Sequence, residues 1–373
     1  MNDVEALIAF SCTPGIGPSR LNQLLIHYGS LQGILASSPE QWTHLAGFGP
    51  KIVENWKQVW ACAPWKHEIK LAEKNGVQLI PYTSPLYPAR LKELADFPLI
   101  LYVKGSLLKE EEKSVAIVGT RQPTFYGSQM AHKFGEEMAS AGYSVISGLA
   151  RGIDTAAHSG ALKGGRTLAI LGSGLNWIYP KENYRLAEAI AENGALVSEY
   201  GMETPPTRAA FPRRNRMISG MSQATLLIEA PLKSGAVLTA ELAKQQKRPL
   251  FVLPGRADQE HFRGNHLLIK KGAQLIENSA ELITALGGTV SFNKEKHAGT
   301  DKSGVSGDSG LSQEEGVVMK LLSKDELSLE QIALQTALPI QLLAGVLMGL
   351  VLKGRIEEYP GHLYKKNSSL NGV

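Results

Sequence analysis

Several glycines in the sequence stand next to hydroxyl or guanidinium side chains, which is the chemistry of a phosphate-binding loop. Glycine lets an anion approach the backbone N–H groups closely, and the positive end of a helix dipole favours the anion. Arginine adds a planar fork of donors that matches phosphate oxygens. We therefore predict an anion-binding rim. Its residues in this part of the sequence are Gly119, Thr120, Arg121, Ser147, Gly148 and Arg151.

The densest basic cluster of the chain consists of Arg213, Arg214 and Arg216, with Asn215 among them. On a helix face that is only solvated, acidic residues normally interleave with basic ones, but residues 204–223 contain no Asp or Glu. This composition favours contact with a phosphate backbone over a merely solvent-exposed surface.

A second mixed segment places a cation, an amide and an aromatic ring close together, at Lys181, Asn183 and Tyr184. Tyr184 or Phe211 is a candidate for stacking on a splayed base, which contributes about 1–3 kcal/mol per base in single-strand binders. For Phe211, packing in the core is the stronger expectation.

A glycine-led helix start lies further along, where Ser234 and Gly235 open the segment that ends at Glu241. This segment is similar to the glycine-rich loop of nucleotide phosphoribohydrolases of related architecture. The similarity supports an anion site and, more weakly, hydrolysis. A nucleotide N-glycosidic hydrolase therefore remains the alternative function.

Two other segments resemble catalytic motifs, but the residues around them do not fit the chemistry. The segment 160–167 imitates a Walker A loop, but it has Arg in place of Lys and precedes a predicted strand instead of following one. Asp154 and His158 lie four residues apart without an evident third ligand, so helix capping and packing are the favoured roles. Cys12 and Cys62 are expected to be free thiols. We predict no catalytic residues, no metal site and no cofactor.

Short apolar runs alternate with amphipathic segments in the middle of the chain, which predicts a mostly parallel sheet covered by helices on both faces. Ligands of such sheets bind at the carboxyl ends of the strands, where the strand order reverses. The glycine-rich segments follow these runs directly. The predicted strands are 77–82, 99–103, 115–118, 143–147, 167–171, 195–198, 224–228 and 250–253.

The sequence predicts an extended Rossmann-like α/β domain over residues 66–290, after a helical domain over 1–65. The helical domain contains two similar turns, 13–18 and 45–50, each of which enters a predicted helix. This pattern is typical of helix-hairpin-helix modules, and it leaves DNA contact and plain packing as equal alternatives because the turns carry few basic residues.

Residues 291–310 are rich in Gly, Ser and charge, which predicts a flexible linker. Residues 311–373 read as three helices and a hairpin, which predicts a winged-helix-like domain. Its third helix, 341–353, is nearly all apolar, so protein contact or packing is favoured there over DNA reading. A sequence-specific regulator acting through this domain is a third possibility.

The overall composition is that of an ordinary globular protein. The chain has 373 residues, 43% of them hydrophobic and 20% charged, with 39 Lys+Arg against 35 Asp+Glu and a net charge of +4. We find no apolar run of the roughly 18 residues that indicate a membrane span, and no basic N-terminal leader. A cytoplasmic protein without membrane contact is therefore expected.

Several long segments together resemble the DNA-processing protein family DprA/Smf. They are VGTR (118–121), SGLARGIDTAAH (147–158), LGSGLNWIYPKEN (171–183), SEYG (198–201), FPRRNRMISGMS (211–222), IEAPLKSGAVLTAELA (228–243), VLPG (252–255) and GNHLLIKKGA (264–273). The resemblance extends over essentially the whole chain. It implies a non-enzymatic factor that binds single-stranded DNA, protects incoming DNA and loads the RecA recombinase during natural transformation, acting as a homodimer.

The resemblance also implies a DNA pocket, and the sequence shows one mild change within it. Thr120 stands where many relatives have Ser, which keeps the hydroxyl. Tyr184 follows the YPKEN motif, and its stacking role is less directly implied. The implied pocket residues are Gly119, Arg121, Ser147, Gly148, Lys181, Asn183, Arg213, Arg214, Asn215, Ser234 and Gly235.

Overall fold

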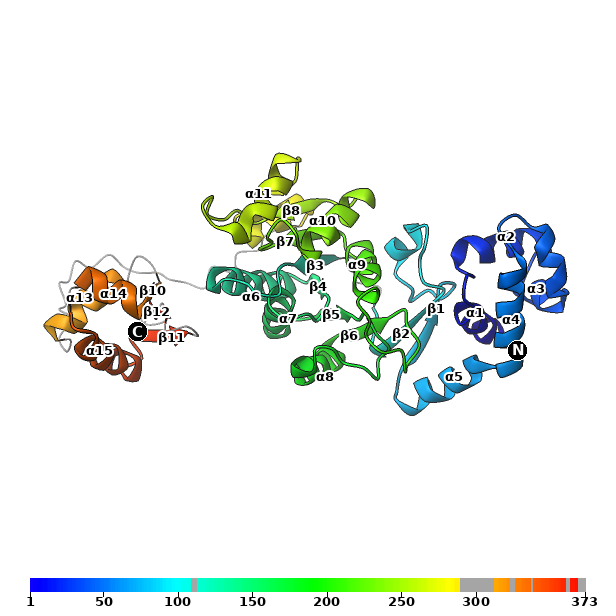
Figure 1. Cartoon of the computed structure of the whole chain (residues 1–373), viewed down its shortest axis with the longest axis horizontal. Helices are drawn as coiled ribbons and strands as arrows, with labels where there is room; N and C mark the ends of the chain where they lie inside the picture. The colour runs from blue at the N-terminus through cyan, green and yellow to red at the C-terminus, as the bar shows by residue number, and fades with distance from the viewer. Residues whose placement is uncertain (109–112, 289–311, 323–325, 337, 360–362, 368–373) are drawn as a thin grey trace. The chain divides into compact units, whose positions relative to one another are not determined.

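The computed structural model divides by its contacts into two units, Met1–Phe292 and Asn293–Val373, which are described separately (Figure 1). The predicted linker, 291–310, lies outside the described residues, as does the Pro360-Gly361 turn of the predicted hairpin. The structure describes residues 1–108, 113–288, 312–322, 326–336, 338–359 and 363–367.

A nine-stranded sheet forms the centre of the first unit, in the order β1-β2-β6-β5-β4-β3-β7-β8-β9. Neighbouring strands from β6 to β9 in this order pair in parallel, whereas β2 pairs antiparallel with β6 and with β1. The strands are β1 (Gln78–Pro81), β2 (Ile100–Gly105), β3 (Ser114–Val118), β4 (Ser144–Ser147), β5 (Thr167–Ile170), β6 (Ala195–Ser198), β7 (Ala224–Leu227), β8 (Leu250–Val252) and β9 (Gln274–Leu275).

This sheet confirms the predicted Rossmann-like, mostly parallel α/β fold. Strands β1 to β8 coincide with the predicted apolar runs to within a few residues at each end. The sequence analysis missed β9, because both of its residues are exposed and no apolar run marks it. The strand order reverses at β3, which has β4 on one side and β7 on the other.

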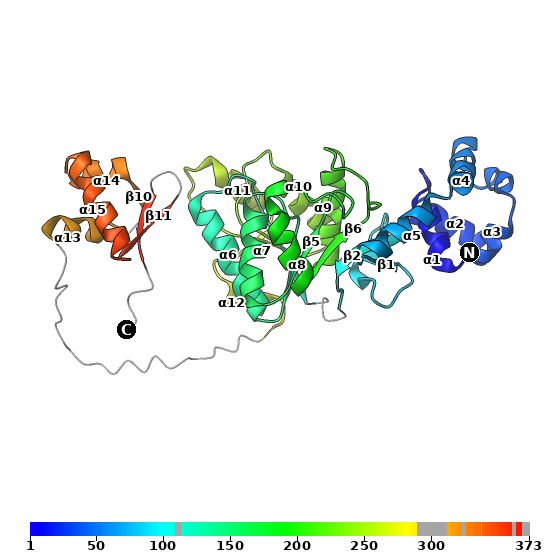
Figure 2. The same ribbon diagram turned by 90° about the horizontal axis from the view of Figure 1, so that it is seen from below.

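Helices cover both faces of the sheet because its central strands are buried on both sides. Val115 and Ile117 of β3 share one core cluster with α6 and α7, whereas Ala116 and Val118 share another with α9 and α10. Figure 2 shows α6, α7 and α8 side by side over the sheet. The helices are α6 (Phe125–Ser140), α7 (Ile153–Gly164), α8 (Tyr184–Asn193), α9 (Ala210–Met221), α10 (Gly235–Gln245), α11 (Arg263–Lys270) and α12 (Ser279–Ala285).

The N-terminal helices enclose an aromatic core in which Phe10 stacks on Trp56 at a centroid distance of 4.6 Å. The two predicted glycine turns precede α2 and α4. The Arg20 guanidinium donates to the backbone oxygens of Gly15 at 2.6 Å and of Gly47 at 3.0 Å, so it ties the two turns together. The helices are α1 (Asp3–Ser11), α2 (Pro18–Tyr28), α3 (Leu31–Ala36), α4 (Pro50–Cys62) and α5 (Pro64–Lys74).

The second unit has the three predicted helices and hairpin of a winged-helix domain, with a third, two-residue strand, β10, paired to β12. Among the described residues, no single helix is long and apolar enough to cross a membrane, and only the bent pair α14–α15 passes that test together. The elements are α13 (Gln313–Leu321), β10 (Leu327–Ser328), α14 (Leu329–Thr336), α15 (Ile340–Leu352), β11 (Ile356–Tyr359) and β12 (Leu363–Lys366).

Candidate functional site

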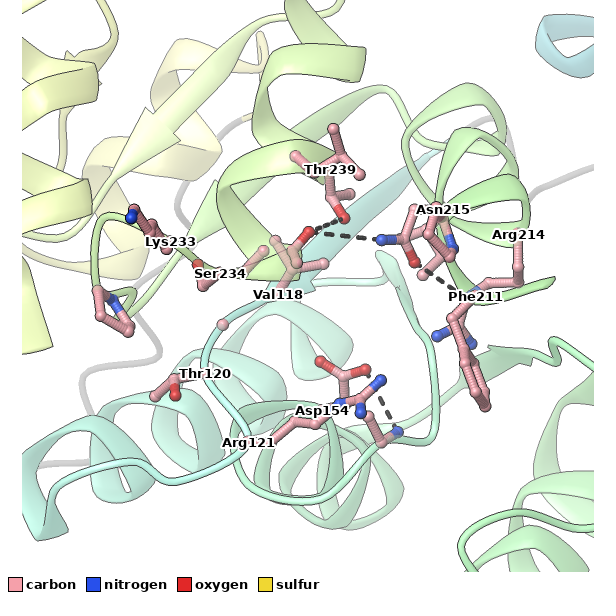
Figure 3. A pocket seen from close by; sticks show the side chains of 18 of the residues that line it. Val118, Thr120, Arg121, Asp154, Phe211, Arg214, Asn215, Lys233, Ser234 and Thr239 are labelled. Atoms are coloured by element: carbon pink, nitrogen blue, oxygen red, sulfur yellow. Dashed lines mark hydrogen bonds between the residues drawn. The ribbon is translucent and has the colours of Figure 1, made fainter. Parts of the chain in front are cut away.

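A cavity of about 600 Å³ lies at the carboxyl ends of the parallel strands, where the strand order reverses. Its lining comes from the loops after β3, β4 and β5 and from the segment after β6 that leads into α9. The loop between β7 and the start of α10 completes it. Figure 3 draws Arg121 and Asp154 at one side of this space, with Lys233 and Ser234, Thr239, and Asn215 around the rest. The cavity therefore stands where a doubly wound sheet binds its ligands.

The loop after β3 needs glycine at position 119. A Cβ atom there would lie 2.4 Å from a side-chain carbon of Ile153 and 2.9 Å from the backbone oxygen of Glu229. Thr120 donates its N–H to that same oxygen at 2.7 Å. The loop is thus fastened to the end of β7, and Arg121, which follows it, is exposed at the cavity.

The loop after β4 is held from inside by Asp154. This carboxylate is buried and accepts the N–H groups of Gly148 at 3.1 Å and Ala150 at 3.3 Å. Gly152 holds the N-cap position of α7, so Asp154 secures the loop before its helix instead of capping the helix as expected. Burial raises the pKa of Asp154, and the nearby Arg214 opposes that rise.

Arg214 lies at the base of the cavity, and its charge is directed into the fold. The guanidinium is 3% exposed and donates to the backbone oxygen of Gly148 at 2.6 Å and to that of Ile170. It therefore joins the ends of β4 and β5. Burial lowers the pKa of Arg214 to about 10, which leaves the side chain protonated at neutral pH.

The start of α10 forms another wall of the cavity. Ser234 caps this helix by accepting the N–H of Val237 at 3.3 Å. Asn215 donates to the backbone oxygen of Gly235 at 3.4 Å, and its own side-chain oxygen accepts from Arg214 at 3.2 Å. These contacts fix the positive end of the α10 dipole at the cavity, where an anion is favoured.

Two aromatic rings form the remaining wall. Tyr179 and Phe211 have their centroids 5.6 Å apart, and the guanidinium carbon of Arg121 lies 5.4 Å from the Phe211 centroid. Phe211, which was expected in the core, is only half-buried and lines the cavity. The two rings are tilted by 39° to each other, so each offers its own aromatic face beside a cation, which suits the stacking of a base.

The structure brings Gly119, Thr120, Arg121, Arg214, Asn215, Ser234 and Gly235 together around the cavity. Gly148 and Arg151 line a smaller adjoining pocket that shares Arg121 and Tyr179. Ser147 is fully buried and donates to the backbone oxygen of Ile117 at 2.7 Å.

Other residues predicted for the site lie outside the cavity lining. Asn183 is buried and donates to the backbone oxygen of Leu149 and to the Thr155 hydroxyl, each at 2.9 Å. Lys181 and Tyr184 are exposed on the neighbouring surface.

Three arginines singled out in the sequence pair with acids. Arg216 is buried outside the cavity lining and pairs with Glu199 at 2.5 Å and with Asp96 at 3.1 Å, so it is not placed to contact a ligand there. Exposed Arg151 forms an ion pair with Glu182. Arg213 is 62% exposed and pairs with Glu199 at 3.2 Å.

Among the lining residues with polar or aromatic side chains, sequence reasoning missed Tyr179, Arg208, Lys233 and Thr239. Arg208 lies in the acid-free stretch around the arginine cluster, and Lys233 directly precedes the glycine-led helix start. Both are cations next to segments that were singled out, and this is the signal that could have found them. No comparable signal marks Tyr179 over Tyr184.

The charged side chains that line the cavity are mostly positive. Arg121, Arg208 and Lys233 are exposed in its lining, and Arg214 is positive at its base. Asp154 is the one carboxylate among the described lining residues, and its hydrogen bonds are directed to the loop. The cavity thus combines cations, a helix N-terminus and a pair of aromatic rings in contact.

Comparison with family models matches three segments of the chain. Residues 78–287 match the model of DNA recombination-mediator protein A, and residues 306–362 match that of the DprA winged helix domain. Residues 8–61 match the model of a SAM-like helix-hairpin-helix tandem.

Individual relatives agree with these family models. Protein Smf of Synechocystis is 34% identical over 389 residues, which cover 96% of this chain and 98% of the relative. The crystal structure of DNA processing protein A from Streptococcus pneumoniae superposes with a TM-score of 0.65 at 29% identity, covering 74% of this chain and 95% of the other. A structure of DNA processing protein A from Helicobacter pylori, described for its single-stranded DNA binding mode, gives a TM-score of 0.52 at 34% identity, covering 57% and 97%.

Proposed function

Because the chain belongs to the family of DNA recombination-mediator protein A, whose members are named DprA or Smf, we propose that it binds single-stranded DNA in the cavity. The family takes part in DNA processing and recombination. One observation carries the proposal for this chain: Arg121, Arg208, Arg214 and Lys233 converge with the start of α10 and an aromatic pair on one cavity.

The geometry suggests separate roles for the residues. Arg121, Arg208 and Lys233 are exposed and pair with phosphate oxygens, while the backbone N–H groups at Ser234 and Gly235 donate to a phosphate at the helix start. The Tyr179–Phe211 wall stacks on a base.

A second group of residues holds the loops that carry these contacts. Ser147, Gly148, Asn183 and Arg214 form internal hydrogen bonds that fix the ends of β4 and β5 and the loop between β4 and α7. We assign to Arg151, Lys181, Tyr184 and Arg213 contacts with nucleotides that extend past the cavity, because these four side chains are exposed beside it.

The family membership leads us to propose a wider role as well. In this role the protein protects incoming single-stranded DNA and loads the RecA recombinase during natural transformation. It acts as a homodimer in the cytoplasm and catalyses no reaction. The carboxylate in the described cavity lining, Asp154, is buried and bonded to its own loop, which supports a binding function over acid–base chemistry.

The alternative, a nucleotide N-glycosidic hydrolase, draws on the segment from Ser234 to Glu241. Its acid, Glu241, does not line the cavity; it borders a different pocket and pairs with Lys271 at 3.6 Å. Incubating the protein with nucleoside monophosphates and assaying released base separates the two functions. Release of free base would support the hydrolase.

Equilibrium binding to labelled oligonucleotides tests the main proposal. Single-stranded DNA should bind more tightly than the duplex of the same sequence, because stacking on Tyr179 and Phe211 requires unpaired bases. Affinity should fall by about tenfold or more between roughly 50 and 200 mM salt, as released counterions drive phosphate binding. Equal affinity at both salt concentrations would contradict the proposal.

A further inference from the structure

Helix α5, which ends the N-terminal helical region, contacts the loop after β6 through two side chains. His67 lies 3.3 Å from Glu203 in an exposed contact, whereas Glu68 is half-buried. Glu68 accepts the backbone N–H of Met202, in the loop after β6, at 2.9 Å. It also forms a side-chain hydrogen bond with Tyr102, a buried residue of β2. Glu68 therefore connects the helix both to β2 of the sheet and to the loop after β6.

The loop after β6 in turn holds the segment that follows β5. Gly174 donates its N–H to the backbone oxygen of Thr204 at 2.8 Å, and Asn176 donates to that of Met202 at 3.2 Å. The indole N–H of Trp177 donates to the backbone oxygen of Glu203 at 3.0 Å. These hydrogen bonds join the two segments side by side.

The segment after β5 leads directly into the aromatic wall of the cavity. Tyr179 follows Trp177 by two residues, lines the cavity and packs against Phe211 at 5.6 Å. A chain of contacts thus runs from Glu68 through the loop after β6 to Tyr179.

We propose that Glu68 is a positioning residue for this wall: through the loop after β6 it holds Tyr179 where a base can stack between the wall and the cations. This inference rests on the proposed single-stranded DNA binding. Without the carboxylate, the Met202 N–H and the Tyr102 hydroxyl lose their acceptor. The loop after β6 then keeps only the exposed contact of Glu203 with His67 among its described side-chain hydrogen bonds to α5.

The sign of the effect separates positioning from simple electrostatics. Removing a negative charge from a DNA-binding protein strengthens binding through the overall field. Loss of a positioned stacking wall weakens binding. Glu73 provides the matched control, because it is an exposed acid on the same helix and its removal changes the charge by the same amount.

The test compares Glu68→Ala with Glu73→Ala in the full-length chain, by fluorescence anisotropy with labelled oligothymidine and with an abasic oligonucleotide of equal length. Glu68→Ala should bind oligothymidine about three- to tenfold more weakly. This loss is smaller than that expected for complete removal of base stacking, because the aromatic rings are still present. Its affinity for abasic DNA should stay unchanged or rise slightly. Glu73→Ala should match the unsubstituted protein, or bind slightly more tightly, on both oligonucleotides.

Two further variants guard against general misfolding. Glu68→Gln keeps an oxygen that can accept the Met202 N–H, so it should recover most of the lost affinity. Trp177→Phe removes the donor to Glu203 one step further along the chain of contacts, and it should reproduce the base-dependent loss.

The outcomes decide between the two proposals. If Glu68→Ala binds oligothymidine as Glu73→Ala does, or loses equal affinity on both oligonucleotides, the positioning role is overturned and DNA binding stands. If the unsubstituted protein binds neither oligonucleotide, both proposals fall.

Discussion

Arginines that line the same cavity differ in role because burial differs. Arg214 is 3% exposed with its donors on two backbone oxygens, so removing it would leave buried acceptors unpaired and destabilise the fold. Arg121 is exposed and stacks on Phe211, so its removal leaves the packing of the sheet intact. Arg121 is therefore the side chain that tests ligand binding without disturbing stability.

Arg121→Ala should weaken single-stranded DNA binding by about tenfold for all sequences alike. The slope of log affinity against log salt concentration should fall by the amount that corresponds to about one phosphate contact. The thermal midpoint should stay within about 1 °C, as for other exposed substitutions. Arg263→Ala, which removes the same charge from α11 outside the cavity lining, should change affinity much less. Equal losses for both variants would mean that net charge, and not the cavity, governs binding.

His158 makes stability depend on pH. The imidazole is fully buried with Nδ1 at 2.7 Å from the Thr167 hydroxyl, and burial lowers the pKa of His158 to about 3. In the unfolded chain the imidazole of His158 takes up a proton near pH 6.5, whereas in the folded chain it stays neutral. The contribution of the neutral, buried His158 to the free energy of unfolding is therefore complete above pH 6.5. It is lost progressively as the pH falls from about 6.5 toward 3, because only the unfolded state takes up the proton.

Denaturant unfolding at pH 7 and pH 5 should show this loss, at no more than about 1.4 kcal/mol per pH unit. His158→Asn should be less stable at pH 7, since it leaves a void, yet its stability should change less between the two pH values. The same decrease in both proteins would show that other groups cause the pH dependence.

At the scale of elements, the contact between α6 and α7 fixes the helix at which the loop after β4 ends. The two helices pack closely, and a Cβ atom at Gly160 would lie 1.9 Å from the backbone oxygen of His132. Helix α7 carries Asp154, which fastens the loop after β4. The distance between these helices therefore helps to place the cavity wall.

Gly160→Ala should destabilise the first unit by about 1–3 kcal/mol, because an overpacked core must shift. Gly345→Ala, in α15 of the second unit, adds a methyl group into open space, and should stabilise that helix by up to about 1 kcal/mol. Amide hydrogen exchange resolved by peptide reports the two units separately. Faster exchange in α6 and α7 is expected only for Gly160→Ala.

At the scale of the whole molecule, we expect the proposed DNA binding not to depend on the winged-helix unit. The cavity lies entirely within the first unit. In the second unit, the exposed side chains of α15 include Leu342, Met348 and Leu352, and the only basic residue at its end, Lys353, pairs with Glu315 at 2.8 Å. This helix offers apolar contact instead of the arginine and amide side chains that read base edges.

A chain truncated after residue 305 should therefore bind single-stranded DNA within about twofold of the full-length affinity, since the phosphate contacts that set affinity lie in the cavity. Anisotropy titrations of both chains at equal salt give the comparison. Loss of binding on truncation would favour a role of the second unit in DNA contact.

Sequence alone determined the fold class and the edge of the sheet that carries the site. Apolar runs such as 115–118 and 224–228 are local signals of buried parallel strands, and the polar glycine segments follow those runs directly. Parallel strands place all such segments at one edge, so their convergence did not require knowledge of tertiary contacts.

Only the tertiary structure decided which side chains face the cavity. Arg213 and Arg214 are consecutive on α9, and helical geometry turns them about 100° apart, so one pairs with Glu199 and the other caps buried carbonyls. Tyr179 reaches the wall, whereas Tyr184 stands outside it, because the loop after β6 holds the segment around Trp177. Such choices depend on contacts between residues distant in sequence, which local pattern does not contain.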